Sequence, residues 1–81
     1  MKNEILISYK MIEAGHAVSY VVTDSNTYQL LRGEYETDST IYDDYAPEVQ
    51  WNLFILVLRS LDLDLNKVEI ERGFRKIWVR Y

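Results

Sequence analysis

The stretch ILISYKMIEAGHAVSYVVTD, residues 5–24, predicts a β-hairpin, and the rest of the fold builds outward from it. Apolar and polar side chains alternate on both sides of a turn at residues 13–16, where Gly15 can adopt a positive φ. One register gathers most of the apolar side chains on a single face, pairing Ile7 with Val22, Tyr9 with Tyr20 and Met11 with Val18. A helix would scatter the polar side chains around its cylinder, so we expect strands over 5–12 and 17–24.

A third strand is expected after a turn at residues 24–27, because Asp, Ser, Asn and Thr side chains readily bond to their own backbone. A loop of three or five residues would pair Val22 with Tyr28 and Tyr20 with Leu30. We expect this strand to end near residues 33–36. The apolar face of this meander would then consist of Ile5, Ile7, Tyr9, Met11, Val18, Tyr20, Val22, Tyr28 and Leu30.

A helix is expected from about Asp44 to Leu61 or Asp62. Asp44 is a good N-cap, and Pro47 would lie in the first turn, where its missing N–H costs nothing. The polar residues make only a narrow stripe, so the apolar surface exceeds the stripe of about 100° seen on ordinary surface helices. One sheet cannot cover that arc, so we expect the C-terminal segment or another chain to cover the remainder.

The last segment, residues 67–81, alternates again. A turn at Arg72 and Gly73 would pair Val68 with Ile77 and Glu69 with Lys76; alternatively, Gly73 marks a bulge in one long strand. The sequence thus predicts a single α+β domain over residues 1–81, in the order β-β-β-α-β(-β). It would be a three-stranded antiparallel meander with one long apolar helix packed on it and one or two C-terminal strands.

Composition narrows the classes of function. The chain has 81 residues, no cysteine and a formal net charge of −4. Disulfides and thiolate metal sites are therefore excluded, and a reducing compartment such as the cytoplasm fits. An acidic surface disfavours direct binding to nucleic acid or anionic lipid and tolerates basic partners. The longest apolar run, residues 53–58, is too short to cross a bilayer.

Catalytic and metal-binding motifs are weak. His16 is the only histidine, and without a cysteine or a second histidine a nucleophilic triad is disfavoured. The segment DLDLNKVEIE, residues 62–71, begins like a calcium-binding EF-hand loop. However, Lys67 stands where that loop needs glycine and Gly73 where it needs glutamate. We therefore expect no enzyme, no metal site and no cofactor.

The C-terminal cations and aromatic rings allow two interpretations. Arg72, Arg75, Lys76 and Arg80 interleave with Phe74, Trp78 and Tyr81, a pattern that can bind single-stranded nucleic acid. The negative charge of the chain argues against this. The favoured interpretation is that these cations neutralise Glu69, Glu71 and the acidic stretch described next.

The acidic stretch, EYETDSTIYDDYAPE at residues 34–48, holds six carboxylates and no cation. A solvated loop and a helix start explain part of it, since acids are stabilised at the positive end of a helix. Spaced carboxylates can also imitate a phosphate backbone, and tyrosines are enriched at interfaces. The predicted partner-binding residues are Glu34, Tyr35, Glu36, Asp38, Tyr42, Asp43, Asp44, Tyr45 and Glu48.

The expected function is a non-enzymatic, acidic binding protein that inhibits a basic partner, such as a nuclease or another nucleic-acid-handling defence effector. In size, charge and mixed α/β pattern, the chain resembles the small inhibitors made by phages or carried beside toxins, including anti-CRISPR proteins and nuclease immunity proteins. That resemblance includes no diagnostic motif, so it assigns no functional residue. The alternative is a structural homo-oligomer, such as a homodimer, or an accessory protein, assembled through the apolar helix.

Overall fold

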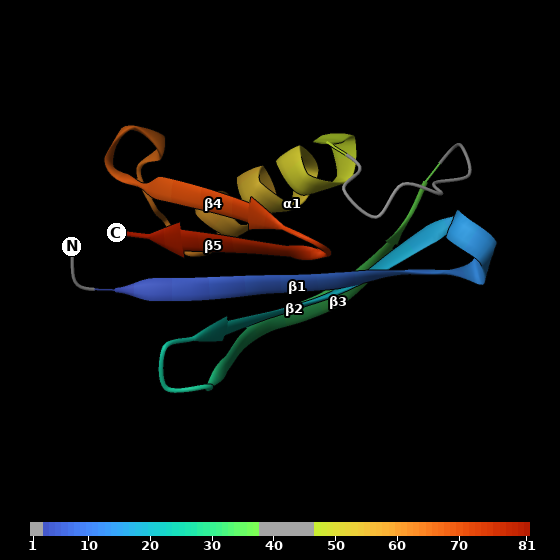
Figure 1. Cartoon of the computed structure of the whole chain (residues 1–81), viewed down its shortest axis with the longest axis horizontal. Helices are drawn as coiled ribbons and strands as arrows, with labels where there is room; N and C mark the ends of the chain where they lie inside the picture. The colour runs from blue at the N-terminus through green and yellow to red at the C-terminus, as the bar shows by residue number, and fades with distance from the viewer. Residues whose placement is uncertain (1–2, 38–46) are drawn as a thin grey trace.

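The computed structural model describes residues 3–37 and 47–81. It confirms an α+β fold, in which one α-helix packs on one face of a five-stranded antiparallel sheet (Figure 1). No helix in the described residues is both long enough and apolar enough to span a membrane. The elements are β1 (Glu4–Ile12), η1 (Glu13–Gly15), β2 (Ala17–Asp24), β3 (Gln29–Glu36), α1 (Pro47–Ser60), η2 (Leu65–Lys67), β4 (Glu69–Gly73) and β5 (Lys76–Arg80).

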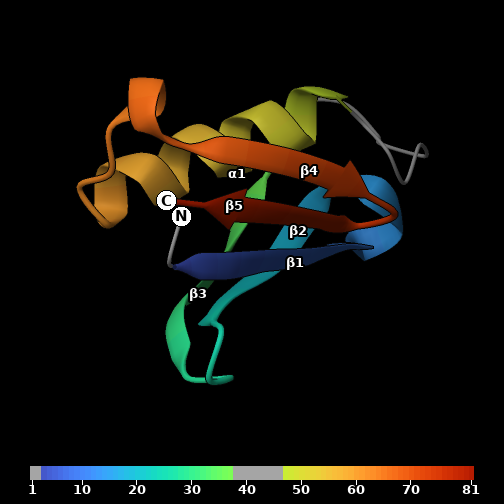
Figure 2. The same cartoon turned by 60° about the vertical axis from the view of Figure 1, so that its left-hand side comes forward.

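The order of strands across the sheet is β3-β2-β1-β5-β4, so the predicted meander with added C-terminal strands is wrong in its arrangement. The last strand, β5, lies against β1 near the centre, and β4 takes the edge (Figure 2). This position brings Val79 opposite Ile5 and Ile77 opposite Ile7, beneath the helix. The β1–β5 pairing continues beyond β5, because Asn3 and Tyr81 exchange two backbone hydrogen bonds of 2.9 Å.

The first hairpin has the predicted register. Tyr9 lies opposite Tyr20, Ile7 opposite Val22 and Met11 opposite Val18. All three pairs are on the face that contacts α1. Gly15 has a φ of 90°, as the turn requires. Glu13 and Ala14 also have positive φ, so this tight connection is formed by three consecutive residues in unusual conformations.

The third strand has a different register from the predicted one. Val22 lies opposite Leu31 rather than Tyr28, a shift of three residues. The turn pairs Asp24 with Tyr28, which accounts for two of them, and a bulge between Val22 and Thr23 adds the third. One extra residue exchanges the two faces of a strand, so Leu31 packs against the core. Tyr28 is instead 70% exposed, and Leu30 is also exposed. The expectation that these two residues line the inner face is therefore wrong.

Helix α1 buries one face rather than most of its circumference. The buried residues follow a helical stripe: Val49, Gln50, Leu53, Phe54, Val57 and Leu58. Trp51 is 55% exposed, and Ile55 and Leu56 are only partly buried at the flanks. The expectation of a helix that is apolar nearly all round is therefore not supported. The predicted N-cap, Asp44, lies outside the described residues.

The helix ends in a Schellman motif, which connects it to the C-terminal hairpin. The backbone N–H of Leu63 donates to the carbonyl oxygen of Leu58 (2.8 Å), and that of Asp62 donates to Arg59 (3.3 Å). Asp62 occupies the left-handed position of the motif, with a φ of 55°. Leu63 then packs on the core, which fixes where the chain leaves the helix.

The C-terminal segment forms a hairpin whose turn is Phe74 and Arg75, not Arg72 and Gly73. Gly73 lies opposite Lys76, and Glu69 lies opposite Arg80, so the predicted pairs and the single bulged strand are both wrong. Arg75 has the positive φ, 56°. Gly73 is needed for a different reason, because a Cβ there would lie 2.8 Å from Cζ3 of Trp78.

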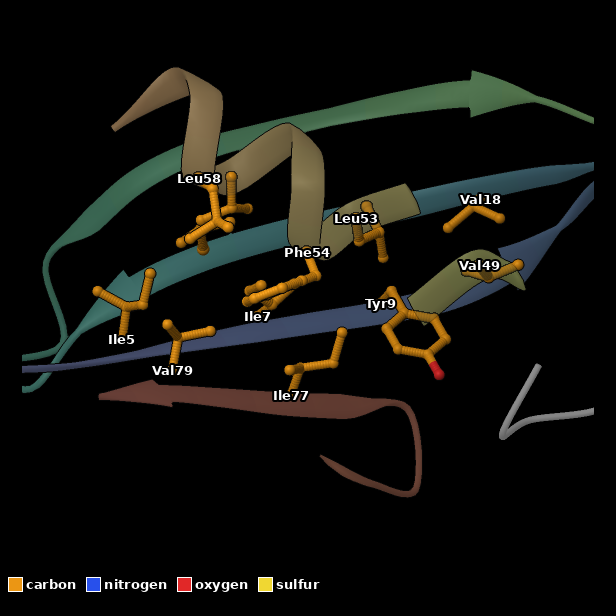
Figure 3. Close-up of a cluster of buried hydrophobic side chains, with 12 residues drawn as sticks. Ile5, Ile7, Tyr9, Val18, Val49, Leu53, Phe54, Leu58, Ile77 and Val79 are labelled. Carbon is orange, nitrogen blue, oxygen red and sulfur yellow. The ribbon is translucent and has the colours of Figure 1, made fainter. Parts of the chain in front are cut away.

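The core lies between α1 and the inner face of the sheet (Figure 3). Its fully buried side chains come from β1, β2 and β5 as well as the helix. The face of the sheet turned away from α1, called the outer face here, carries most of the polar residues of the strands, together with Leu6, Val21 and Trp78. This arrangement decides which of the predicted interaction residues share a surface.

Candidate functional site

The acidic residues that the structure brings together are Glu34 and Glu36. Both lie on the outer face of β3, one of the two edge strands, and both are exposed. They lie opposite Ser19 and Ala17 of β2, so the ladder fixes their spacing. Residues two apart on an antiparallel strand are separated by about 6.8 Å. The two carboxylates therefore form a short, rigid row.

Tyr35 lies on the other side of the same strand. It is opposite Val18 on the inner face, and its ring centroid is 6.4 Å from that of Tyr20. Its hydroxyl oxygen is buried without a hydrogen-bond partner among the described residues. Burial raises the pKa of this phenol, and repulsion from ionised Tyr9 and Tyr20 adds to the effect. Tyr35 thus packs with the core side of the sheet.

Of the remaining predicted residues, the structure describes only Glu48. Glu48 is exposed in the first turn of α1, in the helix layer on the inner side of the sheet. It therefore does not share the outer face with Glu34 and Glu36. The other five predicted residues lie outside the described part of the chain: Asp38, Tyr42, Asp43, Asp44 and Tyr45.

A shallow hollow of about 270 Å³ adjoins Glu34. Arg32 and Glu34 border it from β3, and Ser19 and Val21 border it from β2. Gly33 and Tyr20 complete the lining, and the Tyr20 ring packs over Gly33 on the inner face, where a Cβ would lie 2.7 Å from the hydroxyl oxygen. The hollow thus combines one cation, one anion and a hydroxyl, which suits a polar side chain of a partner.

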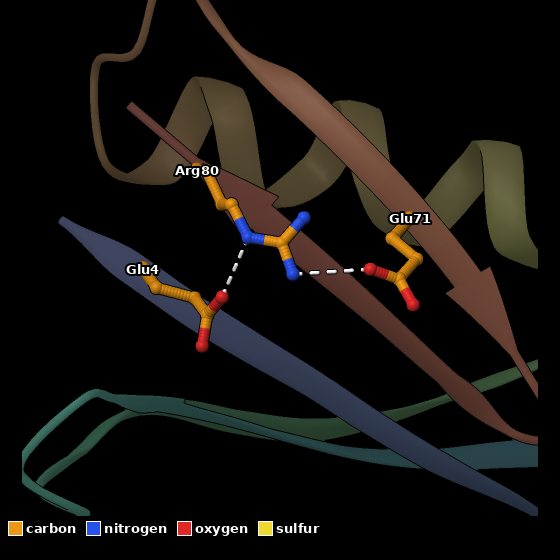
Figure 4. Close-up of polar contacts among 3 residues, drawn as sticks. All are labelled: Glu4, Glu71 and Arg80. Carbon is orange, nitrogen blue, oxygen red and sulfur yellow. Dashed lines mark hydrogen bonds and ion pairs between the residues drawn. The ribbon is translucent and has the colours of Figure 1, made fainter. Parts of the chain in front are cut away.

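Farther across the outer face, Arg80 of β5 forms ion pairs with residues of β1 and β4. Its Nε donates to Glu4 (2.7 Å) and its Nη2 donates to Glu71 (3.0 Å), as Figure 4 shows. The hydrogen bonds to Glu71 and Glu4 raise the pKa of the guanidinium. Neither Glu34 nor Glu36 has an ion pair with another described residue. The expected neutralisation of Glu71 by a C-terminal cation is confirmed.

Metal-binding geometry is not seen in the described ranges 3–37 and 47–81, which hold no group of three His, Cys, Asp or Glu side chains suited to an ion. The segment that begins like an EF-hand has a structural role instead. The Asp64 carboxylate accepts the backbone N–H of Asn66 (2.9 Å) and caps the short helix η2. His16 is exposed, and its backbone N–H donates to Glu13.

A second surface, between α1 and β4, was not recognised in the sequence. Trp51 and Ile70 are exposed there beside a cavity of about 250 Å³. The sequence did indicate an uncovered apolar surface, because the helix has more apolar residues than one sheet can cover. It could not be assigned to a surface without knowing that β4 forms an edge.

Comparison of the chain with protein families, with curated proteins and with solved structures gave no significant match. The functional argument therefore rests on the chain's own surfaces.

Proposed function

We propose that this chain is a non-catalytic binding protein that inhibits a basic, nucleic-acid-handling partner, such as a nuclease or a defence effector. The supporting observation is the pair of exposed carboxylates, Glu34 and Glu36, in a row on one edge strand. Neither has an ion-pair partner among the described residues, so both charges are available to a partner. Such a protein would act in the cytoplasm, as inhibitors carried by phages and other mobile elements do.

The physical basis is competition with nucleic acid for a basic groove. A protein that binds nucleic acid uses Arg and Lys side chains that contact successive phosphates. Carboxylates held at fixed intervals by a strand can occupy the same side chains. The net charge of −4 would speed the encounter at low ionic strength. Short-range contacts would come from the hollow beside Glu34.

The rest of the acidic stretch would extend this surface. Asp38, Asp43 and Asp44 would add charge, while Tyr42 and Tyr45 would add apolar contact area. Glu48 lies in the first turn of α1 on the inner side of the sheet, so it is not part of this surface. In this proposal, Glu34 and Glu36 form the rigid part of the surface.

The test is affinity capture from a lysate, followed by competition with double-stranded DNA. The Glu34→Gln/Glu36→Gln variant should lose the captured basic protein at physiological salt. The matched control, Glu13→Gln/Asp62→Asn, removes the same charge from exposed sites elsewhere and should retain it. DNA should displace the partner from the wild-type chain. Retention of the same partners by the Glu34→Gln/Glu36→Gln variant at the same salt would show that the proposal is wrong.

A homo-oligomer is the second candidate, and the observation that favours it is the exposure of Trp51 beside Ile70. Large apolar side chains grouped on a surface often mark an interface. Light scattering at micromolar concentration, comparing wild type with Trp51→Ala, tests this candidate. A strictly monomeric wild-type chain would exclude it.

A further inference from the structure

The groove between α1 and β4 has an apolar wall and a polar floor. Trp51 and Phe54 line it from the helix, with their ring centroids 5.7 Å apart, and Ile70 lines it from β4. Gln50 lies at its base, where its amide donates to the Gly73 carbonyl oxygen (3.1 Å). The volume is about 250 Å³, and a cavity of about 150 Å³ already holds a benzene ring. The groove therefore has room for one large apolar side chain.

Strand β4 forms one wall of this groove and also an edge of the sheet. It pairs with β5 on one side, and no described strand pairs with its other side. Such an edge presents unpaired N–H and C=O groups that can accept another strand. An edge strand beside a helix is an arrangement in which extended peptides bind by strand addition.

We propose that an extended segment of a partner protein adds to the free edge of β4 as a sixth strand. Its inward side chains would include an apolar residue that enters the groove beside Trp51 and Ile70. Its outward side chains would be Lys or Arg and would lie beside Glu69 and Glu71. This site uses the edge of the sheet opposite to β3, so it is independent of the Glu34 and Glu36 surface.

Charge supports a basic occupant on the outer side. Glu69 and Glu71 both point away from α1, because the residue between them, Ile70, lies opposite the buried Val79. Arg80 neutralises Glu71 in part, and Glu69 has no ion pair among the described residues. Opposite charges directly across two strands are stabilising, whereas like charges are destabilising. A strand alternating between apolar and basic residues therefore matches Glu69 and Glu71 on the outer side of β4 and Ile70 on the inner side, where Arg72 also lines the groove.

A second copy of this chain matches the same edge poorly. In a two-fold antiparallel pairing, the residue on the axis lies opposite its own copy. An axis at Glu69 or Glu71 places two glutamates opposite each other, and an axis at Arg72 places two arginines opposite each other. An axis at Ile70 places Glu69 opposite Glu71 of the other copy. Every such register over residues 69–72 therefore places like charges opposite each other, which favours a different chain as the occupant.

The probe is a fluorescein-labelled peptide, KVKLKVK, which reads the same in both directions, so its orientation need not be known. The control peptide, KKVLVKK, has the same composition but does not alternate. Fluorescence anisotropy should show saturable binding of KVKLKVK and at least about tenfold weaker binding of the control, a difference of about 1.4 kcal/mol. Equal binding of the two peptides would overturn the proposal, because it would reflect charge alone.

Two N-methylated peptides test the backbone pairing directly. One carries N-methyl groups on its three apolar residues, and the other carries them on its inner lysines. Alternate residues of a strand direct their N–H groups to opposite sides. We therefore expect one of these peptides to lose binding about tenfold or more while the other retains it. If both retained the affinity of the unmodified peptide, strand addition would be wrong.

Variants of the protein locate the site. Trp51→Ala and Glu69→Lys should each weaken KVKLKVK binding by about fivefold or more, as an aromatic contact and a reversed charge predict. Tyr28→Ala removes a more exposed ring beside the opposite edge strand and should leave binding unchanged, as should Glu34→Gln/Glu36→Gln. Ile70→Thr replaces Trp51→Ala if that variant fails to fold.

Amide chemical shifts provide the final criterion. Peptide binding should perturb residues 69–73 and the indole N–H of Trp51. Perturbations confined to β3 would overturn the proposal. So would a wild-type dimer in which the β4 amides are protected from exchange without peptide, because that result would assign the edge to a second copy.

Discussion

The side-chain amide of Gln50 donates a hydrogen bond of 2.8 Å to the hydroxyl of Tyr9, inside the core between α1 and β1. The same nitrogen also donates to the carbonyl oxygen of Gly73 at the end of β4. Gln50 is only 2% exposed, so water cannot replace either bond. One amide thus fixes the first turns of the helix against both the centre and the edge of the sheet.

Replacing Gln50 should therefore destabilise the fold despite the gain in apolarity. Gln50→Leu removes the donor from a buried acceptor, Tyr9, and from a partly buried one, Gly73, and we expect a loss of about 1–3 kcal/mol in the free energy of unfolding. Urea denaturation measures this change. Asn52→Leu, at an exposed position of the same helix, is the control and should change stability by less than about 0.5 kcal/mol.

A double-mutant cycle with Tyr9→Phe separates the Gln50–Tyr9 bond from the bond to Gly73. We expect a coupling energy of about 0.5–1.5 kcal/mol between Gln50 and Tyr9. Additive effects in the cycle would contradict the hydrogen bond.

Tyr35→Phe should leave stability at neutral pH unchanged or raise it by about 1 kcal/mol. The reason is that the mutation removes a buried hydroxyl that has no hydrogen-bond partner among the described residues. A clear loss of stability in urea denaturation would show that the hydroxyl is paired after all. Tyr28→Phe, at an exposed position, is the control.

Tyr35 should also make the wild-type chain sensitive to alkali. Burial raises the folded-state pKa of Tyr35 above its unfolded value near 10. Below about pH 10 both states keep the proton, and stability is unaffected. As pH rises further, the unfolded state loses the proton first, so unfolding becomes more favourable. Tyr35→Phe should reduce the loss of stability between about pH 9 and 11, whereas Tyr28→Phe should not.

Asp62→Gly should stabilise the chain by about 1 kcal/mol. Asp62 has a left-handed backbone conformation that glycine adopts without steric cost, and it places a negative charge at the negative end of α1. Thermal unfolding measures the gain as a higher Tm. Ser60→Gly, inside the last turn of the helix, should instead lower Tm. Equal effects of the two glycines would rule out the left-handed position as the cause.

Arg80→Met should destabilise the chain at low salt because it removes the contacts of β5 with Glu4 and Glu71. The three side chains are exposed enough for salt to screen them, so the difference from wild type should shrink at about 1 M NaCl. Lys76→Met, on the same strand but without an ion pair among the described residues, should show little salt dependence. Salt-independent destabilisation would assign the role of Arg80 to packing.

The sequence predicted the first hairpin correctly because alternation and Gly15 indicate the same register. It could not reveal the bulge at the start of β3, since Leu30 and Leu31 are both leucine and either can point inward. The buried part of the helix surface was overestimated because Trp51, Ile55 and Leu56 were assigned to buried surface by residue type. Apolar side chains often remain partly exposed, so type alone does not decide burial.

The C-terminal turn was misplaced because Gly73 suggested a turn residue. Glycine is instead needed because the ring of Trp78, from the neighbouring strand, occupies the space that a side chain at position 73 would take. The acidic site stays a prediction, and the structure separates the members that it describes. Glu34 and Glu36 share an exposed face, whereas alternation along β3 turns Tyr35 to the other side. A composition-based prediction gathers charged and aromatic residues into one patch, but a strand separates neighbours onto two faces.

The pairing of β1 with β5 has a consequence for how the sheet folds. These adjacent central strands are the most distant strands in sequence, so their contact closes the longest loop in the fold. Closing a loop of about 60 residues costs about 3.6 kcal/mol of chain entropy by the logarithmic estimate. The β1–β2–β3 hairpins can form locally, but the edge of β1 stays unpaired until β5 arrives. A β5 strand from a neighbouring molecule could fill that edge, so refolding at high concentration is expected to produce strand-swapped dimers.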